Sequence, residues 1–176
     1  LAAQVKAPVV VFAYTGRENS SAAYVFNQEE NFYYLTGHNE EGAALLLLPP
    51  DAAENGWKGP GEILFLPPRD PSQERWNGPR IGPADPDVAE KSGFAAVEPF
   101  PNLKSRLADV AKTYKEIYTL APHDNDTGYP HAREWSQWLE QAVPGVALRD
   151  AAPAIGALRQ IKSPGEISLL TKAIEL

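Results

Sequence analysis

The chain has 176 residues, 43% of them hydrophobic, which suits one domain with a full hydrophobic core. Its formal net charge is −7 and it has no basic stripe, which argues against nucleic acid or an anionic membrane surface as the main partner. It contains no cysteine, which excludes disulfides and thiolate metal sites, and its longest apolar run, residues 43–48, is far too short to span a bilayer.

The first part of the chain is rich in predicted strands. Runs of β-branched, aromatic and aliphatic residues predict strands at residues 7–14, 42–49 and 62–67, with a shorter extended piece at 24–26. Residues 27–37 fit either a strand or a short helix, and Gly37 would suit the C-terminal end of such a helix. The segment 51–61 is rich in turn formers and predicts a hairpin connection.

The second part alternates helices with strands. Helices are predicted at residues 85–93, 102–114, 127–143 and 151–161, and strands at 116–120 and 146–148. Asp85 and Asp150 are the expected N-caps of the first and last of these helices. Ser163-Pro164-Gly165-Glu166 is a capping box that opens a further helix, whose apolar face is still running at Leu176. That missing stop predicts that the chain is part of a longer protein. The order of elements predicts an α/β fold, a mixed sheet with helices packed on it.

The segment from residue 64 to residue 82 is the most unusual part of the sequence. Two prolines end a strand, and Arg69-Asp70-Pro71 predicts a turn. Trp76 then lies among charged residues on a predicted exposed loop, with Arg80 close behind it. Loops held by a scaffold often carry binding groups, but a tryptophan can equally cap a local cluster while the arginines stay in solvent. The residues alone leave both interpretations open.

The histidines are weak candidates for a metal site. His38, His123 and His131 have no partners at the spacing of a metal-binding helix. His123-Asp124-Asn125-Asp126 is rich in oxygen ligands, yet a metal would need three or four that converge. A solvated turn is the better interpretation of this stretch.

The remaining polar and aromatic groupings also have ordinary explanations. The pairs Glu29-Glu30 and Glu40-Glu41 are expected to be solvated loop charges rather than catalytic carboxylates. Trp135 and Trp138 share one face of a predicted helix and are expected to pack in the core. The sequence has no Gly-x-Ser-x-Gly elbow and no phosphate-binding loop, so it offers no catalytic constellation of its own.

Three segments carry recognisable motifs. Phe26-Asn-Gln-Glu-Glu-Asn-Phe-Tyr-Tyr-Leu-Thr-Gly37 is similar to Phe-x-Gln-x-x-Asn-Phe-Tyr-Tyr-Leu-Thr-Gly. Residues 67–82 are similar to Pro-x-Arg-Asp-Pro followed by Glu-x-Trp-x-Gly-x-Arg-x-Gly, and residues 158–167 to Leu-Arg-x-Ile-Lys-Ser-Pro-x-Glu-Ile. Together these segments resemble the N-terminal domain of the aminopeptidase P and prolidase group, the creatinase-type pita-bread metallopeptidases. The second segment is more similar to aminopeptidase P than to prolidase.

The resemblance implies a mixed six-stranded β-sheet flanked by helices, with a ribonuclease H-like motif, over residues 1–161. Residues 162–176 would begin a linker helix into a C-terminal metallopeptidase domain. In the family two divalent metals, usually manganese, sit in that C-terminal domain on two Asp, two Glu and one His. No residue of this chain is therefore assigned a catalytic or metal-binding role.

The resemblance also implies a function. The chain would be the non-catalytic N-terminal domain of an Xaa-Pro aminopeptidase, a cytoplasmic enzyme that removes the residue preceding a proline. Its partners would be its own catalytic domain, further copies in a homodimer or homotetramer, and a peptide with proline second. In tetrameric members the motif's Trp reaches toward a neighbouring active site, and Trp76 would hold that position, with Arg80 as its companion. A prolidase parent and a free-standing peptide-binding module are the alternatives.

Overall fold

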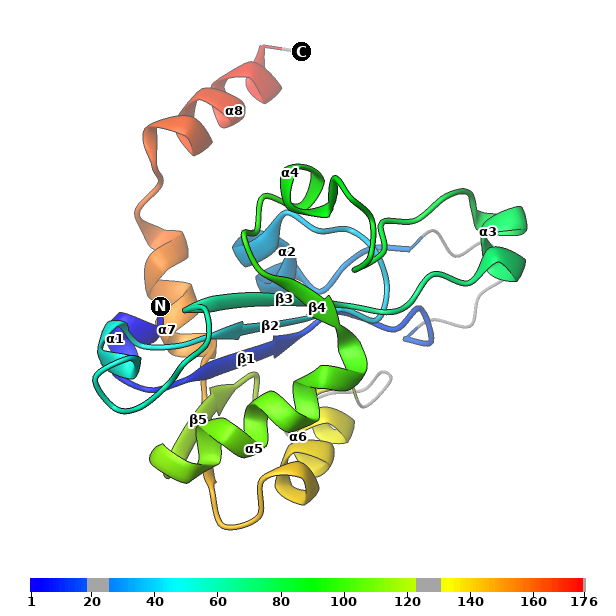
Figure 1. Cartoon of the computed structure of the whole chain (residues 1–176). Helices are drawn as coiled ribbons and strands as arrows, with labels where there is room; N and C mark the ends of the chain where they lie inside the picture. The colour runs from blue at the N-terminus through cyan, green and yellow to red at the C-terminus, as the bar shows by residue number, and fades with distance from the viewer. Residues whose placement is uncertain (19–25, 123–130, 176) are drawn as a thin grey trace.

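The computed structural model describes residues 1–18, 26–122 and 131–175. In these ranges six strands form one sheet, in the order β4-β3-β2-β1-β5-β6 (Figure 1). The strands are β1 (Val9–Phe12), β2 (Ala44–Leu47), β3 (Glu62–Leu66), β4 (Val97–Pro99), β5 (Glu116–Thr119) and β6 (Ala147–Asp150). β1 pairs antiparallel with β2 and β2 with β3, whereas the β3–β4, β1–β5 and β5–β6 pairs are parallel. The sheet is therefore mixed, as the sequence predicts.

Helices lie on both sides of this sheet. They are α1 (Ala2–Val5), α2 (Glu30–Thr36), α3 (Pro71–Asn77), α4 (Val88–Ser92), α5 (Leu103–Thr113), α6 (His131–Ala142), α7 (Ala152–Gln160) and α8 (Pro164–Ile174), with short 3-10 turns η1 (Pro50–Ala52) and η2 (Phe100–Asn102). α2 and α4 lie on one side of the sheet and α5 and α6 on the other (Figure 1).

The central strands bury side chains on both faces, which is why they are apolar without interruption. Because neighbouring residues of a strand point to opposite faces, Val10 and Phe12 pack toward α5 and α6, while Val9 and Val11 pack toward α2 and α7. Phe12 stacks on Trp135, with ring centroids 4.1 Å apart, and meets the edge of Trp138 at 5.9 Å. The two tryptophans therefore pack against the core, as predicted.

Most predicted elements are present, with corrections at some of their ends. The ambiguous residues 27–37 contain α2, and Gly37 ends it with a left-handed φ of 66°. α4 begins after Asp87 rather than after Asp85, because the Asp85 carboxylate accepts a hydrogen bond from the backbone amide of Gly82 instead. Residues 24–25 and 127–130, parts of a predicted strand and helix, lie outside the described residues.

The ends of the later helices are close to the predicted ones. The N-cap of α7 is Ala151, although the Asp150 carboxylate still accepts from the amide of Ala152 at 3.0 Å. The capping box of Ser163 and Glu166 at the start of α8 is confirmed. The edge strand β4 has no sequence signal, since its three residues end in an exposed proline and show no alternation.

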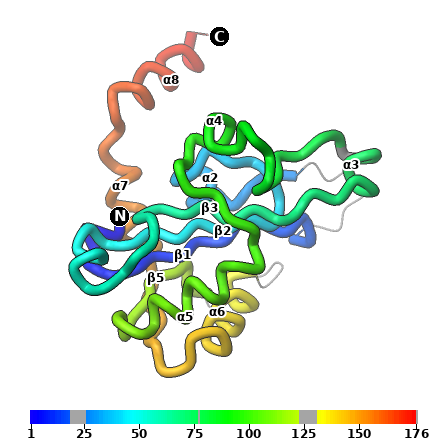
Figure 2. Tube along the Cα trace, in the orientation of Figure 1, coloured from blue at the N-terminus to red at the C-terminus, as the bar shows by residue number. Residues whose placement is uncertain are grey.

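α8 extends away from the sheet beyond α7, as the trace in Figure 2 shows. Its apolar side chains are exposed: Ile167 54%, Leu169 68%, Leu170 51% and Ile174 85%. Within the described ranges no helix is both long and apolar enough to cross a membrane.

A matched pair of leucine truncations tests this division between core and exposed helix. Leu107→Ala removes a fully buried side chain and should lower the free energy of unfolding by about 3 kcal/mol. Leu169→Ala, on the exposed face of α8, should change it by less than about 0.5 kcal/mol. Urea denaturation of the 176-residue chain measures both, and equal losses would show that α8 packs on the domain in solution.

Candidate functional site

Residues 67–85 leave the sheet after β3 and return to it before α4, forming a projection that we call the arm. Its far end is the short helix α3 (Figure 1). The Asp70 carboxylate accepts from the amide of Ser72 at 2.9 Å, Pro71 occupies the first turn, and Gly78 ends the helix with a φ of 84°. The predicted loop around Trp76 is thus wrong: these residues form a capped helix, too short for apolar periodicity to reveal.

Trp76 lies in the last turn of α3 and is 88% exposed. An indole at this exposure makes little contact with its own domain, which favours the contact interpretation of Trp76 over the packing one. Large aromatic side chains are rarely left in solvent without another role, and they are enriched at contact surfaces. The end of the arm is therefore a candidate contact surface.

Arg80 lies on the returning side of the arm and binds the body of the domain. Its guanidinium pairs with Glu41 at 2.9 Å, and the backbone amide of Ile81 donates to Glu40 at 3.3 Å. Burial raises the pKa of the Glu40 carboxyl, against the opposing effects of the Ile81 amide and the Arg80 charge. The prediction that Glu40 and Glu41 are solvated loop charges is wrong, since both are half-buried and hold the arm.

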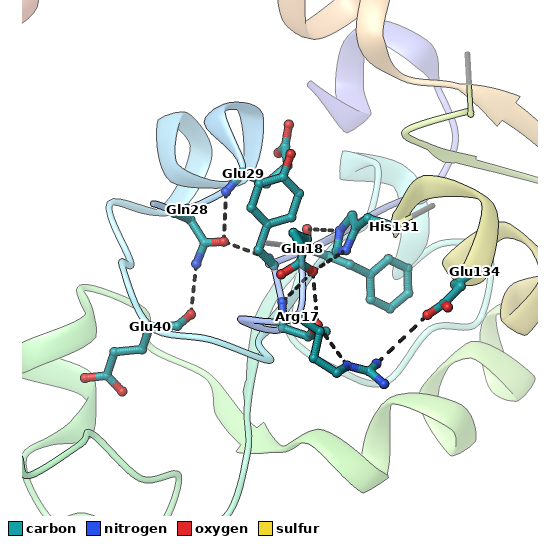
Figure 3. Close-up of polar contacts among 10 residues, drawn as sticks. Arg17, Glu18, Gln28, Glu29, Glu40, His131 and Glu134 are labelled. Atoms are coloured by element: carbon teal, nitrogen blue, oxygen red, sulfur yellow. Dashed lines mark hydrogen bonds and ion pairs between the residues drawn. The ribbon is translucent and has the colours of Figure 1, made fainter. Parts of the chain in front are cut away.

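Gln28, in the first motif, positions the segment that carries those two glutamates. Its side-chain oxygen accepts from the amides of Tyr14 at 2.8 Å and Glu29 at 3.0 Å, and its nitrogen donates to the carbonyl of Glu40 at 2.8 Å (Figure 3). Glu29 in turn caps α2, because its carboxylate accepts from the amide of Phe32 at 2.6 Å. Of the Glu29-Glu30 pair, only Glu30 is an exposed charge.

A second polar cluster buries His131 against Glu18 (Figure 3). His131 Nδ1 lies 3.1 Å from Glu18 Oε1, and its Nε2 lies 3.4 Å from the carbonyl oxygen of Phe12. Glu18 Oε1 also accepts from the amide and hydroxyl of Thr15. Burial works to raise the pKa of Glu18, but the Thr15 hydrogen bonds and the His131 charge bring it below its usual value. The cluster joins the first residue of α6 to the segment after β1, a contact between residues 113 positions apart that no spacing could signal.

The described residues do not assemble a metal site. Across residues 1–18, 26–122 and 131–175, no three His, Asp or Glu side chains gather in a way that could hold a metal ion. The oxygen-rich stretch of residues 123–126 lies outside the described residues. What the described part of the chain offers instead is a fixed scaffold and an exposed aromatic at the end of the arm.

The sheet order and the helices on both faces define an α/β domain with a mixed sheet. Residues 2–118, more than half of the chain, match the family model described as the aminopeptidase P N-terminal domain, so the chain belongs to that family. The recognition and the predicted fold class are thereby confirmed.

Solved structures agree with this family. The chain is similar to aminopeptidase P from Escherichia coli with the inhibitor Pro-Leu, at 26% identity and a TM-score of 0.73, over 96% of this chain and 38% of that one. It shares its fold with proline aminopeptidase P II from Yersinia pestis, at 24% identity and a TM-score of 0.69, over 96% and 38% of the two chains. The chain thus spans well under half the length of these relatives. A comparison with curated protein sequences gives no match.

The buried histidines should make the stability of the domain fall in mild acid. Burial lowers the pKa of both His38 and His131, and the charge of Glu18 opposes this effect at His131. The unfolded chain therefore takes up protons near pH 6.5 that the folded chain does not, and the free energy of unfolding falls as pH drops below that value.

Urea midpoints at pH 7.5 and pH 5.5 measure this effect, and the double variant His38→Gln/His131→Gln should reduce the difference between them. Glu18 loses its contribution only below about pH 4.5, outside this window. A wild-type midpoint that is unchanged or higher at pH 5.5 would contradict the prediction.

Proposed function

We propose that this chain is the non-catalytic N-terminal domain of an Xaa-Pro aminopeptidase, and that Trp76 contributes to the substrate entrance or to a contact between subunits. Membership of the aminopeptidase P N-terminal family supports the parent activity. The observation that carries the role of Trp76 is its 88% exposure at the end of an arm that is tied to the domain at its base.

The chemistry would belong to a C-terminal catalytic domain, corresponding to the larger part of the relatives' chains that this chain does not span. Two divalent metal ions, manganese by preference, would be held there and would supply an activated water for hydrolysis of the bond before proline. The N-terminal domain formed by this chain would contribute by holding the arm where a peptide enters the enzyme. It would also support a homodimer or homotetramer.

The magnitude of aromatic burial supports a role for Trp76 in such a contact. Covering an indole of about 200 Å² would contribute about 5 kcal/mol before the costs of ordering are subtracted. A contribution of this size would measurably strengthen the binding of a small peptide or a contact between two subunits. Arg80, by contrast, is engaged with Glu41, so we assign it to holding the arm rather than to contact with the substrate.

The exposed face of α8 suits the proposed linker to the catalytic domain. Its aliphatic side chains lie on successive turns and remain uncovered by the described part of this chain. We propose that residues 1–161 form the domain proper and that residues 162–176 begin the linker helix, with the catalytic domain covering its apolar face.

Assays of the full-length protein with added Mn²⁺ test the parent activity. Release of the first residue from Xaa-Pro-Yaa peptides, with no turnover by the 176-residue chain, supports an Xaa-Pro aminopeptidase. Cleavage of Xaa-Pro dipeptides alone indicates a prolidase parent. No hydrolysis by the full-length protein, together with direct binding of peptides, indicates the free-standing module and would falsify the proposal.

Trp76→Ala separates a contact role from a packing role. In the full-length enzyme it should reduce kcat/KM for Xaa-Pro-Yaa peptides or weaken assembly, measured by steady-state kinetics and analytical ultracentrifugation. In the 176-residue chain it should leave the free energy of unfolding within about 0.5 kcal/mol, because the side chain is already in solvent.

Trp135→Ala is the matched control for this substitution, because the Trp135 ring stacks on Phe12 in the core. It should cost about 3 kcal/mol of stability in the same chain. If Trp76→Ala destabilised the chain as much and left the kinetics untouched, Trp76 would be a packing residue.

A further inference from the structure

Arg69 connects the three parts of the arm at its base. The guanidinium donates through Nε to Glu74 Oε1 at 2.7 Å, and through Nη2 to the other oxygen of the same carboxylate. Its Nη1 reaches Asp85 Oδ1 at 3.5 Å. Arg69 lies on the outgoing side of the arm, Glu74 on α3 and Asp85 on the returning side, so one side chain links all three.

The stem of Arg69 lies directly on the backbone of Gly82. A Cβ atom added at Gly82 would be 2.6 Å from Arg69 Cγ and 2.8 Å from Cδ, far inside van der Waals contact. Those carbons cannot move aside freely, because the guanidinium beyond them is held by two carboxylates. The amide of Gly82 donates to the other oxygen of Asp85 at 3.0 Å, so the returning backbone is held on both sides.

The hydrogen bonds to Glu74 also favour its charged form. The hydrogen bond from Arg69 lowers the pKa of Glu74, and the backbone amide of Arg80 adds to the effect. The Glu74 side chain is 12% exposed and Arg69 45%, so water and salt screen the pair only in part. Two parallel hydrogen bonds in one plane fix an orientation, which a single charge contact does not do.

We propose that Arg69 is a positioning residue that sets the direction of α3 and therefore of Trp76. Arg80 and Glu41 tie the arm to the domain, whereas Arg69, Glu74, Gly82 and Asp85 tie the arm to itself. The effect of Arg69 on α3 stands on this geometry alone. Its effect on peptide hydrolysis rests on the proposed function of Trp76.

Two substitutions disturb this base by different physical means. Arg69→Lys keeps the charge but loses the planar fork that binds Glu74. Gly82→Ala keeps Arg69 and displaces its stem. Arg133→Lys, on the exposed surface of α6 and outside the arm, is the matched control, because it makes the same Arg-to-Lys change and leaves the cleavage site after Arg75 intact.

Limited trypsin digestion of the 176-residue chain measures how often the arm opens. Cleavage after Arg75 should become about tenfold faster in Arg69→Lys and in Gly82→Ala, because it follows the population of the opened arm. The control should cleave at the wild-type rate, and the urea midpoints of all the variants should stay close to wild type. Wild-type cleavage rates in both base variants would overturn the positioning role.

Kinetics of the full-length enzyme provide the second measurement. Arg69→Lys should lower kcat/KM for Xaa-Pro-Yaa peptides about as much as Trp76→Ala, and the double variant should lose no more than either single variant, since both act through Trp76. Additive losses would overturn this coupling. Unchanged kinetics in Trp76→Ala combined with faster cleavage in Arg69→Lys would refute the proposed role of Trp76 and leave the positioning of α3 supported.

Discussion

The side-chain amide of Gln28 is the contact on which the arrangement around the arm depends. It joins the end of β1, the start of α2 and the approach to β2 through four hydrogen bonds in a buried position. Leaving such groups unpaired in the interior would cost about 1–3 kcal/mol each. The backbone of Glu40 is thereby fixed independently of the arm. The carboxylates of Glu40 and Glu41 can then bind the arm at a defined position.

The polar contacts of the arm determine geometry more than stability. Seven residues are too few to form a stable helix alone, so α3 depends on its Asp70 cap and on the ion pairs at its base. Partly exposed ion pairs contribute little to the free energy of unfolding, which comes mainly from the two apolar cores. The arm can therefore lose its direction while the domain remains folded.

The sequence predicts the parts of this fold that local physics determines. Central strands, the end of α2 at Gly37 and the α8 capping box follow from apolar runs and from Gly, Ser and Pro at their expected places. The contacts of the site do not, because Arg80 with Glu41 and His131 with Glu18 join residues 39 and 113 positions apart. Arg69 and Glu74 lie five positions apart, and this spacing predicts no contact unless a helix is known to begin at Pro71.

Trp76 and the exposed apolar side chains of α8 suit different kinds of contact. A stable interface buries about 1,200–2,000 Å² in total, far more than one indole can supply, so Trp76 alone could form only a small part of such an interface. In α8, Ile167, Leu170 and Ile174 form an exposed stripe over about two turns, a pattern typical of a helix face that packs against another element. Packing Trp76 into its own domain would stabilise the arm but withdraw the indole from any partner. The ion pairs and hydrogen bonds at the base of the arm avoid this loss, because they hold α3 in place while Trp76 remains in solvent.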